Sequence, residues 1–283
     1  MTGYREENKL IMDKNAPIGV FDSGVGGLTG AREIMRQIPN ERIVYFGDTA
    51  RVPYGSKSKD NIIKFSRQII RFLQTENVKA IVIACNTASA LALDEMQQEF
   101  ELPILGVVKP GAKVAVETTA NKRIGLIGTE ANIRSGVYTR YIKSLDDEAK
   151  VFEKACPLFV PLVEEGWLHD DITLQVASRY LEELKEKDID TLIMGCTHYP
   201  LIRSTIRKVM GDKVNLVNPA YETAIELKNL LERDNLANKC DVDSPSSMYR
   251  FYVSDAEEKF KLFANSILPF DITMTKQINI ENY

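Results

Sequence analysis

Cysteine and histidine are scarce in this sequence, which has four cysteines and two histidines among 283 residues. The cysteines, at positions 85, 156, 196 and 240, include no Cys-x-x-Cys pair. They are too few for a disulfide framework in a chain of this length. Only Cys196 and His198 lie close together, whereas a zinc site requires three or four protein ligands. We therefore expect neither a disulfide scaffold nor a bound metal.

The sequence also lacks a basic excess and a long apolar run. Its 36 basic residues face 40 acidic ones, which leaves a net charge of −4 instead of the basic surface that nucleic-acid binders present. No apolar run approaches the roughly 20 residues of a membrane-spanning helix, and the first seventeen residues are too polar for a signal peptide. We expect a cytoplasmic protein with no nucleic-acid or membrane partner.

Short β-branched runs alternate with segments of helical periodicity along the chain. Helices are expected around Ile62–Leu73 and Leu174–Leu184, where apolar residues recur at helical spacing. This alternation predicts an α/β fold, with mostly parallel sheets covered by helices on both faces. The expected strands are Ile18–Phe21, Arg42–Phe46, Ala80–Ala84, Ile104–Val108, Arg123–Ile127, Lys150–Phe152, Thr191–Met194 and Val214–Val217.

The two halves of the sequence resemble each other. Ile18–Val20 recurs as Ile124–Leu126, and Ala80–Cys85 recurs as Thr191–Cys196 at a similar separation. Buried strands are all rich in Ile, Val and Leu, but this does not explain why two of them should end in cysteine. We interpret the halves as two copies of one α/β unit.

The last sixty residues begin with an expected helix over Ala224–Leu231 and a polar stretch over Asn235–Ser247. A strand over Tyr249–Val253 and a helix over Ala256–Ile267 come next. We expect these elements to pack on the first half. The first domain would then be discontinuous, with residues 1–109 and 219–283, and the second pseudo-symmetric domain would span 110–218, with the active site in the cleft between them.

Two turns carry cysteine at the end of a predicted strand. Cys85 and Cys196 each follow a strand and are expected to open a helix, and the carboxyl ends of parallel strands are where ligands bind. The positive end of the helix dipole favours a thiolate over a thiol. The unpaired backbone N–H groups of the helix N-terminus, together with the side chains of Asn86, Thr87 and Thr197, could bind a carboxylate.

A single cysteine flanked by apolar residues is usually an inert small hydrophobe, which is our interpretation of Cys156 and Cys240. For Cys85 and Cys196 the repeat favours a functional interpretation. If the halves face each other about a pseudo-twofold axis, the two thiols approach one pocket from opposite sides. Racemisation requires such a pair, a base on one face of a carbon and an acid on the other.

Two loops of the first half complete the predicted pocket. Asp22–Gly27 follows the first strand, but the third glycine of a G-x-G-x-x-G dinucleotide motif falls on Thr29, so the match is weak. Asp22 suits a substrate ammonium group, or the orientation of a nearby cysteine, better than a pyrophosphate. The loop Gly47–Ser56 is expected beside it, where Ser56 could receive a second carboxylate.

Four segments together resemble the signature segments of bacterial glutamate racemases, in the order and spacing of that family: Phe21–Leu28, Gly47–Arg51 with Pro53–Gly55, Ala84–Ala88 and Gly195–Leu201. Val52 departs from the family, which often has cysteine there. The resemblance implies two α/β domains with glutamate bound between them and no pyridoxal phosphate, metal or nucleotide cofactor. It also implies a homodimer and a D-glutamate product that supplies peptidoglycan for the cell wall.

The resemblance assigns roles to individual residues. Cys85 and Cys196 match the family's two catalytic cysteines, and Asp22 and His198 would assist proton transfer by tuning these thiols. Glu164 resembles a further acidic position near the second cysteine. The positions that match substrate contacts of the family are Asp22, Ser23, Tyr54, Gly55, Asn86, Thr87, Thr197 and His198.

Three other functions stay open from the residues alone. The same two-thiol arrangement would serve a racemase of aspartate or of another amino acid. The Asp22–Gly27 turn would fit a nucleotide-dependent oxidoreductase if it bound a cofactor. A binding or regulatory protein could keep such a pocket without turnover, although the presence of both cysteines weighs against this.

Overall fold

The computed structural model describes residues 13–239, 248–272 and 274–283. The strands are β1 (Ile18–Asp22), β2 (Ile43–Gly47), β3 (Ala80–Ile83), β4 (Ile104–Gly106), β5 (Arg123–Gly128), β6 (Lys150–Ala155), β7 (Thr191–Gly195), β8 (Asn215–Val217), β9 (Tyr249–Val253) and β10 (Lys276–Gln277). They form a six-stranded sheet of order β10-β9-β2-β1-β3-β4 and a four-stranded sheet of order β6-β5-β7-β8. Every strand pair in the described residues is parallel.

Helices cover both faces of each sheet, which confirms the predicted α/β class. The helices are α1 (Leu28–Gln37), α2 (Lys59–Thr75), α3 (Asn86–Glu99), α4 (Val108–Thr118), α5 (Glu130–Ser135), α6 (Val137–Leu145), α7 (Phe159–Glu164), α8 (Asp171–Lys185), α9 (Arg203–Met210), α10 (Pro219–Arg233) and α12 (Glu257–Ile267). The first sheet lies between α1, α10 and α12 on one face and α2 and α3 on the other. The second lies between α7, α8 and α9 and the pair α4 and α6.

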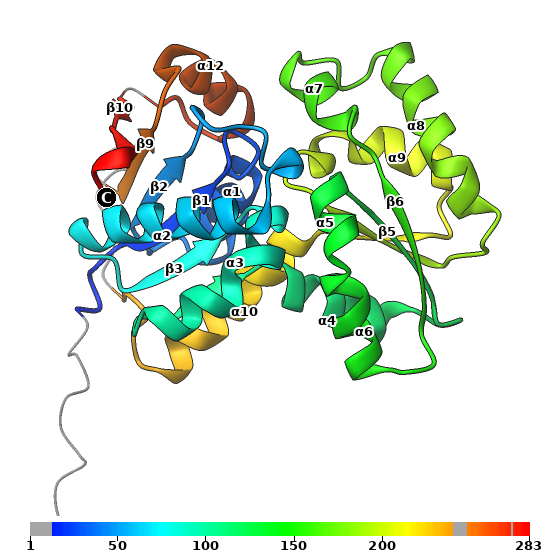
Figure 1. The fold of residues 1–283 in the computed structure, drawn as a ribbon, viewed down its shortest axis with the longest axis horizontal. Coiled ribbons are helices and arrows are strands. Elements are labelled where there is room, and N and C mark those ends of the chain that lie inside the picture. Colours follow the sequence, from blue (N-terminus) through cyan, green and yellow to red (C-terminus); the bar gives the residue numbers. More distant parts are fainter. Residues whose placement is uncertain (1–12, 240–247, 273) are drawn as a thin grey trace, which may run out of the picture.

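Figure 1 shows each sheet in its own lobe, the first in blue, cyan, orange and red and the second in green and yellow. We call the first sheet with its helices the first lobe and the second sheet with its helices the second lobe. The first sheet takes its strands from residues 18–106 and 249–277, and the second from 123–217. The exact domain limits, with 110–218 as the second domain, stay a prediction.

The sequence repeat corresponds to a structural repeat. In both lobes the first strand lies between the second and the third, and the fourth lies outside the third. The register repeats as well, because Ile18 pairs with Ala80 in the first sheet and Ile124 pairs with Thr191 in the second. The ends of β3 and β7, which lead into the two cysteines, are therefore equivalent positions.

Local signals explain where most elements begin. All five residues of β1 are buried, as its apolar sequence predicts. Helix α2 buries Ile62, Ile69 and Leu73 on one side, and the Ser58 side chain caps it by accepting a hydrogen bond from the N–H of Asn61. The strand predicted over Tyr249–Val253 has these bounds and pairs with β2, so the late elements do pack on the first lobe.

Three predicted boundaries are wrong. The strand expected over Lys150–Phe152 continues to Ala155, because its pairing with β5 extends to Gly128. The strand expected to reach Val108 ends at Gly106, because α4 begins at Val108, whose N–H donates to the Ser89 hydroxyl. The helix expected from Ala224 begins earlier, at Pro219, since Asn218 caps it and proline is favoured in a first turn.

Part of the polar stretch Asn235–Ser247, including Cys240, lies outside the described residues. None of the helices in the described part of the chain combines the length and the apolar character that crossing a bilayer requires.

Candidate active site

A small cavity with lining residues from both lobes is the candidate site. Its volume is about 50 Å³, and the cysteines after β3 and β7 both line it. The lining residues are Ser23, Gly24, Val52, Pro53, Tyr54, Gly55, Cys85, Asn86, Thr87, Thr129, Val160, Glu164, Gly195, Cys196, Thr197 and His198. The structure thus brings together every sequence-predicted site residue except Asp22 and Ser56.

The two cysteine turns lead into different kinds of helix. Cys85 is the residue that precedes α3, so its thiol lies at a helix N-terminus as expected. After Cys196 the chain forms a 3₁₀ helix over Tyr199–Ile202 instead of an α-helix, which corrects the prediction for the second turn. The reason is Pro200, which lacks the N–H that an α-helical bond to the Cys196 carbonyl would need. The helix-terminus argument therefore applies to Cys85 alone.

Burial disfavours ionisation of the Cys85 thiol. Burial raises the pKa of this thiol to about 12, and the neighbouring Asp22 carboxylate adds to the shift. The N–H of Ala88 and the hydroxyl of Ser23 oppose the shift without cancelling it. Burial thus opposes the thiolate that the helix N-terminus is expected to favour at Cys85.

Asp22 lies at the end of β1 and is fully buried. Its Oδ2 accepts hydrogen bonds from the N–H groups of Gly24 (3.1 Å) and Gly27 (2.9 Å), whereas Oδ1 has no hydrogen-bond partner among the described residues. Burial raises the pKa of this carboxyl, although His198 and the N–H groups of the turn oppose the shift. Asp22 does not line the cavity, so the structure links it to Cys85 instead of exposing it to a ligand.

The glycines of the Asp22–Gly27 turn permit close approach of the two lobes. A Cβ on Gly27 would lie 2.3 Å from the Cβ of Asp22. A Cβ on Gly26 would lie 2.5 Å from the ring of His198 and from Oγ1 of Thr197, both in the second lobe. The turn of the first lobe thus packs directly against the Cys196 turn.

Cys196 heads a short chain of polar contacts. Its Sγ lies 3.8 Å from Nδ1 of His198, and Nε2 of His198 lies 3.1 Å from Oε1 of Glu164. Burial alone would lower the pKa of His198, but its hydrogen bonds with Cys196 and Glu164 outweigh burial and raise that pKa to about 10. The bond with His198 in turn lowers the pKa of Glu164. His198 is thus a cation at neutral pH, held between a carboxylate and the Cys196 sulfur.

The remaining polar groups come from the starts of α3 and α5. The hydroxyls of Thr87 and Thr129 lie 2.9 Å apart across the lobes, and Asn86 Oδ1 accepts a hydrogen bond from the Tyr138 hydroxyl at 2.7 Å. The sequence prediction missed Thr129. The repeat could have identified it, because Thr129 follows β5 as Ser23 follows β1.

Two residues of the Gly47–Ser56 loop behave differently from the prediction. The ring of Tyr54 lines the cavity, but its hydroxyl donates to Asp48. Ser56 is exposed, and its hydroxyl faces the carbonyl of Pro53 at 3.3 Å. The structure therefore does not bring Ser56 to the cavity.

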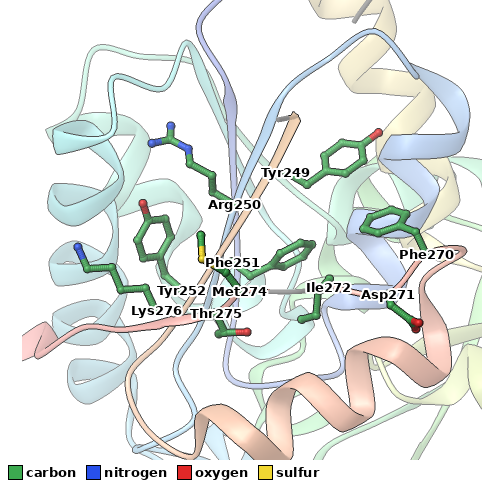
Figure 2. Close-up of a pocket in the computed structure, with 10 residues that line it drawn as sticks. All are labelled: Tyr249, Arg250, Phe251, Tyr252, Phe270, Asp271, Ile272, Met274, Thr275 and Lys276. Carbon is green, nitrogen blue, oxygen red and sulfur yellow. The ribbon is translucent and has the colours of Figure 1, made fainter. Parts of the chain in front are cut away.

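Among the described residues, at least four larger cavities have linings without cysteine, and two of them exceed 500 Å³. One of about 560 Å³ lies beside β9, where the rings of Tyr249 and Phe270 stack (Figure 2). The other, of about 630 Å³, lies between α7 and α12 and shares Gly24, Val52 and Glu164 with the small cavity. Within residues 13–239, 248–272 and 274–283, no group of three or more His, Cys, Asp or Glu side chains could hold a metal ion.

Comparison with known proteins gives concordant matches. The model of the Asp/Glu/Hydantoin racemase family matches residues 28–225. A glutamate racemase of Geobacter metallireducens is 43% identical over 264 residues, 93% of this chain and 97% of the relative. The crystal structure of a glutamate racemase isoform of Bacillus anthracis superposes with a TM-score of 0.89 at 39% identity, covering 94% of this chain and 98% of that one. A glutamate racemase of Francisella tularensis in complex with D-glutamate has a TM-score of 0.88 at 38% identity, covering 95% and 100%.

Proposed function

The chain belongs to the Asp/Glu/Hydantoin racemase family and is an amino-acid racemase, and from this premise we propose that it interconverts L- and D-glutamate. The relatives that match over most of their length are glutamate racemases, and one of the similar structures holds D-glutamate. We propose that the reaction is a proton transfer between two thiols, Cys85 and Cys196, without a cofactor.

One observation carries the mechanism. Cys85 and Cys196 line the same cavity from equivalent positions of a structural repeat, one in each lobe. Removing the α-proton from one face of glutamate and returning a proton to the other requires a base and an acid on opposite sides of the carbon. Two identical groups that exchange these roles serve both directions of the reaction.

The surroundings of the two thiols indicate which one acts as the base and which as the acid when the reaction begins. We assign Cys196 as the base, because its sulfur lies 3.8 Å from Nδ1 of His198, whose ring is held by Glu164. Cys85, with its raised pKa, is the proton donor on the other side. By the family resemblance this is the direction from L- to D-glutamate, and the reverse reaction begins with the proton on Cys196.

Charge on the substrate is matched by polar groups of the cavity. The hydroxyls of Thr87, Thr129 and Thr197 and the amide of Asn86 supply hydrogen-bond donors for two carboxylates. The free N–H groups at the start of α3 add positive potential, which also stabilises the negative charge that develops at the α-carbon. The oxygens of Ser23 and of the nearby turn suit the ammonium group.

Family resemblance supports three further statements. We propose that the protein acts as a cytoplasmic homodimer, that its D-glutamate supplies peptidoglycan synthesis, and that neither nucleic acid nor membrane takes part.

The decisive experiment is a circular-dichroism assay with purified protein and each enantiomer of glutamate. We expect both enantiomers to reach the same racemic end point. Aspartate serves as the comparison substrate, and its kcat/KM should be far lower than that of glutamate. A higher kcat/KM for aspartate would reassign the substrate, and no change with any acidic amino acid would refute the proposed function.

A further inference from the structure

Tyr138 is a buried tyrosine outside the cavity whose hydroxyl reaches a cavity residue. It lies in the first turn of α6 and is 1% exposed. Its ring packs in the core of the second lobe with Val108, Leu126 and Ile193. Its hydroxyl crosses to the first lobe and donates to Oδ1 of Asn86 at 2.7 Å. Tyr138 itself is not among the lining residues, so it has no direct contact with a ligand in the cavity.

The hydrogen bond fixes which end of the Asn86 amide faces the cavity. An asparagine side chain has one acceptor oxygen and one donor nitrogen. Oδ1 is engaged by Tyr138, and Nδ2 has no protein partner among the described residues while Asn86 lines the cavity. The amide therefore presents its donor nitrogen to the ligand.

The reverse orientation of the amide is disfavoured by the surroundings of Tyr138. If the amide turned over, the phenolic hydrogen would lose its acceptor in a core cluster built of apolar side chains. A buried donor without a partner is costly. An Asn86 oxygen facing the cavity would also repel a carboxylate. Tyr138 thus selects the orientation that suits an acidic ligand.

We propose that Tyr138 is a positioning residue for substrate recognition: its hydroxyl, from the second lobe, holds the Asn86 amide of the first lobe so that Nδ2 can donate to a carboxylate of the acidic substrate. The inference rests on the proposed function, since it takes the substrate to be a dicarboxylic amino acid. It makes carboxylate binding depend on the contact between α6 and the start of α3.

The test is the Tyr138→Phe substitution, which removes the hydroxyl and keeps the ring in the core. We expect KM for both glutamate enantiomers to rise about tenfold, because the amide loses its fixed orientation toward a charged group. We expect kcat to change less than about threefold, since the bond acts on substrate binding and not on the transition state alone. Tyr141→Phe, on the same helix, is the matched control, because among the described residues the Tyr141 hydroxyl makes no hydrogen bond with Asn86, and it should keep the wild-type KM.

A double-mutant cycle with Asn86→Ala separates positioning from general stability. Asn86→Ala alone should raise KM at least as much as Tyr138→Phe. In the Asn86→Ala background, Tyr138→Phe should change KM by less than about twofold, because it acts through a side chain that is no longer present.

Either an unchanged KM in Asn86→Ala, or an equal rise in KM from Tyr138→Phe in both backgrounds, would overturn the inference. An unchanged KM in Asn86→Ala overturns the inference even if Tyr138→Phe folds poorly. Failure of the proposed function is distinguishable, because wild-type protein would then show no racemisation of glutamate at all. Wild-type racemisation with an unchanged KM in Tyr138→Phe would refute the inference alone.

Discussion

The two thiols occupy equivalent positions but have different neighbours. Cys85 lies near the buried Asp22 carboxylate, which disfavours a second negative charge. Cys196 contacts the His198 ring, whose pKa is raised to about 10. Ionisation of one thiol is therefore disfavoured and the other thiol has a cation beside it, so the proposed reaction begins from an asymmetric charge distribution.

Replacing either cysteine by serine should abolish racemisation, because a hydroxyl has too high a pKa to act as the base. Elimination from a glutamate analogue with a leaving group on the β-carbon needs only one base. Cys85→Ser should still eliminate from the L-enantiomer and Cys196→Ser from the D-enantiomer, which product formation from each pure enantiomer would measure. Cys156→Ala, which removes a buried thiol outside the cavity, should still racemise. A shared enantiomer preference of the two serine variants would show that the cysteines do not flank the α-carbon.

The Glu164–His198 contact predicts a shift in the pH profile. A raised folded-state pKa means that His198 keeps its proton at neutral pH and loses it as the pH rises through about 10. Glu164→Gln removes the negative partner, so the His198 pKa should fall and the alkaline loss of kcat/KM for L-glutamate should move to lower pH. Glu165→Gln, an exposed neighbour, is the control and should leave the profile in place. An unmoved alkaline limb in Glu164→Gln would exclude His198 as the group that titrates there.

Removing the hydroxyl of Thr87 and removing that of Ser56 are two comparable substitutions that test where the substrate binds. Losing one hydrogen bond to a charged group costs about ten- to a hundredfold in kcat/KM. The sequence alone predicts this loss for both Thr87→Ala and Ser56→Ala. The structure predicts it for Thr87→Ala only, because Ser56 is exposed and directed at the Pro53 carbonyl. Steady-state kinetics of the two variants would decide, and equal losses would mean that the ligand extends beyond this cavity.

At the scale of elements, the turn after β1 determines how closely the lobes approach. Gly26→Ala would place a Cβ 2.5 Å from the His198 ring, so that the ring or the lobe must shift. Displacement of a catalytic group by about 1 Å costs about a hundredfold. We expect kcat/KM to fall by about that factor, with thermal unfolding little changed.

Gly30→Ala on α1 is the control for this substitution. Its Cβ would make only ordinary contacts, at 3.4 Å from Ala84, and alanine favours a helix. Activity should therefore be retained in Gly30→Ala, and an equal loss in both variants would show that the effect does not come from the His198 contact.

Elements were predictable from the sequence where the signal is local. The apolar runs of β1, β3, β7 and β9 identify these strands within about a residue, and the repeat identifies the equivalence of β3 and β7. The 3₁₀ helix after Cys196 was not predicted, because a strand followed by polar residues suggests an α-helix until the missing N–H of Pro200 is considered. The pKa of Cys85 also escaped prediction, because burial is a property of the folded chain.

The candidate site was predictable to the extent that its residues share turns. Most of the lining lies in the four signature segments, where consecutive residues meet the cavity together. Asn86 could be assigned in this way, but its partner Tyr138 could not, because the two residues meet only when the lobes pack. Ser56 was misplaced because a polar residue in a loop gives no indication of the direction of its side chain.

For the whole molecule, the proposed mechanism uses the two thiols as acid and base and requires no further reactive group. We expect racemisation to survive dialysis against a chelator and to need no added nucleotide or pyridoxal phosphate. The measurement is the rate with glutamate before and after dialysis, with and without each addition. Recovery of lost activity by zinc or by a nucleotide would contradict the two-thiol mechanism.

The lobes are joined across the site by few polar contacts. The Thr29 hydroxyl lies 2.9 Å from the carbonyl of Thr197, and Thr87 meets Thr129. The cavity between them, about 50 Å³, is far below the roughly 300 Å³ of the smallest typical ligand pockets. Under the proposed function, this cavity must therefore enlarge before glutamate can bind between the thiols.

The small volume of this cavity has a consequence for the exchange of hydrogen isotopes between the thiols and the solvent. If the enlarged cavity closes over glutamate without solvent, the thiol hydrogens exchange with water only between one closure and the next. In heavy water, each enclosure would therefore deliver only the hydrogens that the sulfurs already carried. The sulfurs would take up deuterium from solvent only while the cavity is open. The deuterium content of the product would therefore report how often the cavity opens, and not how many proton transfers occur.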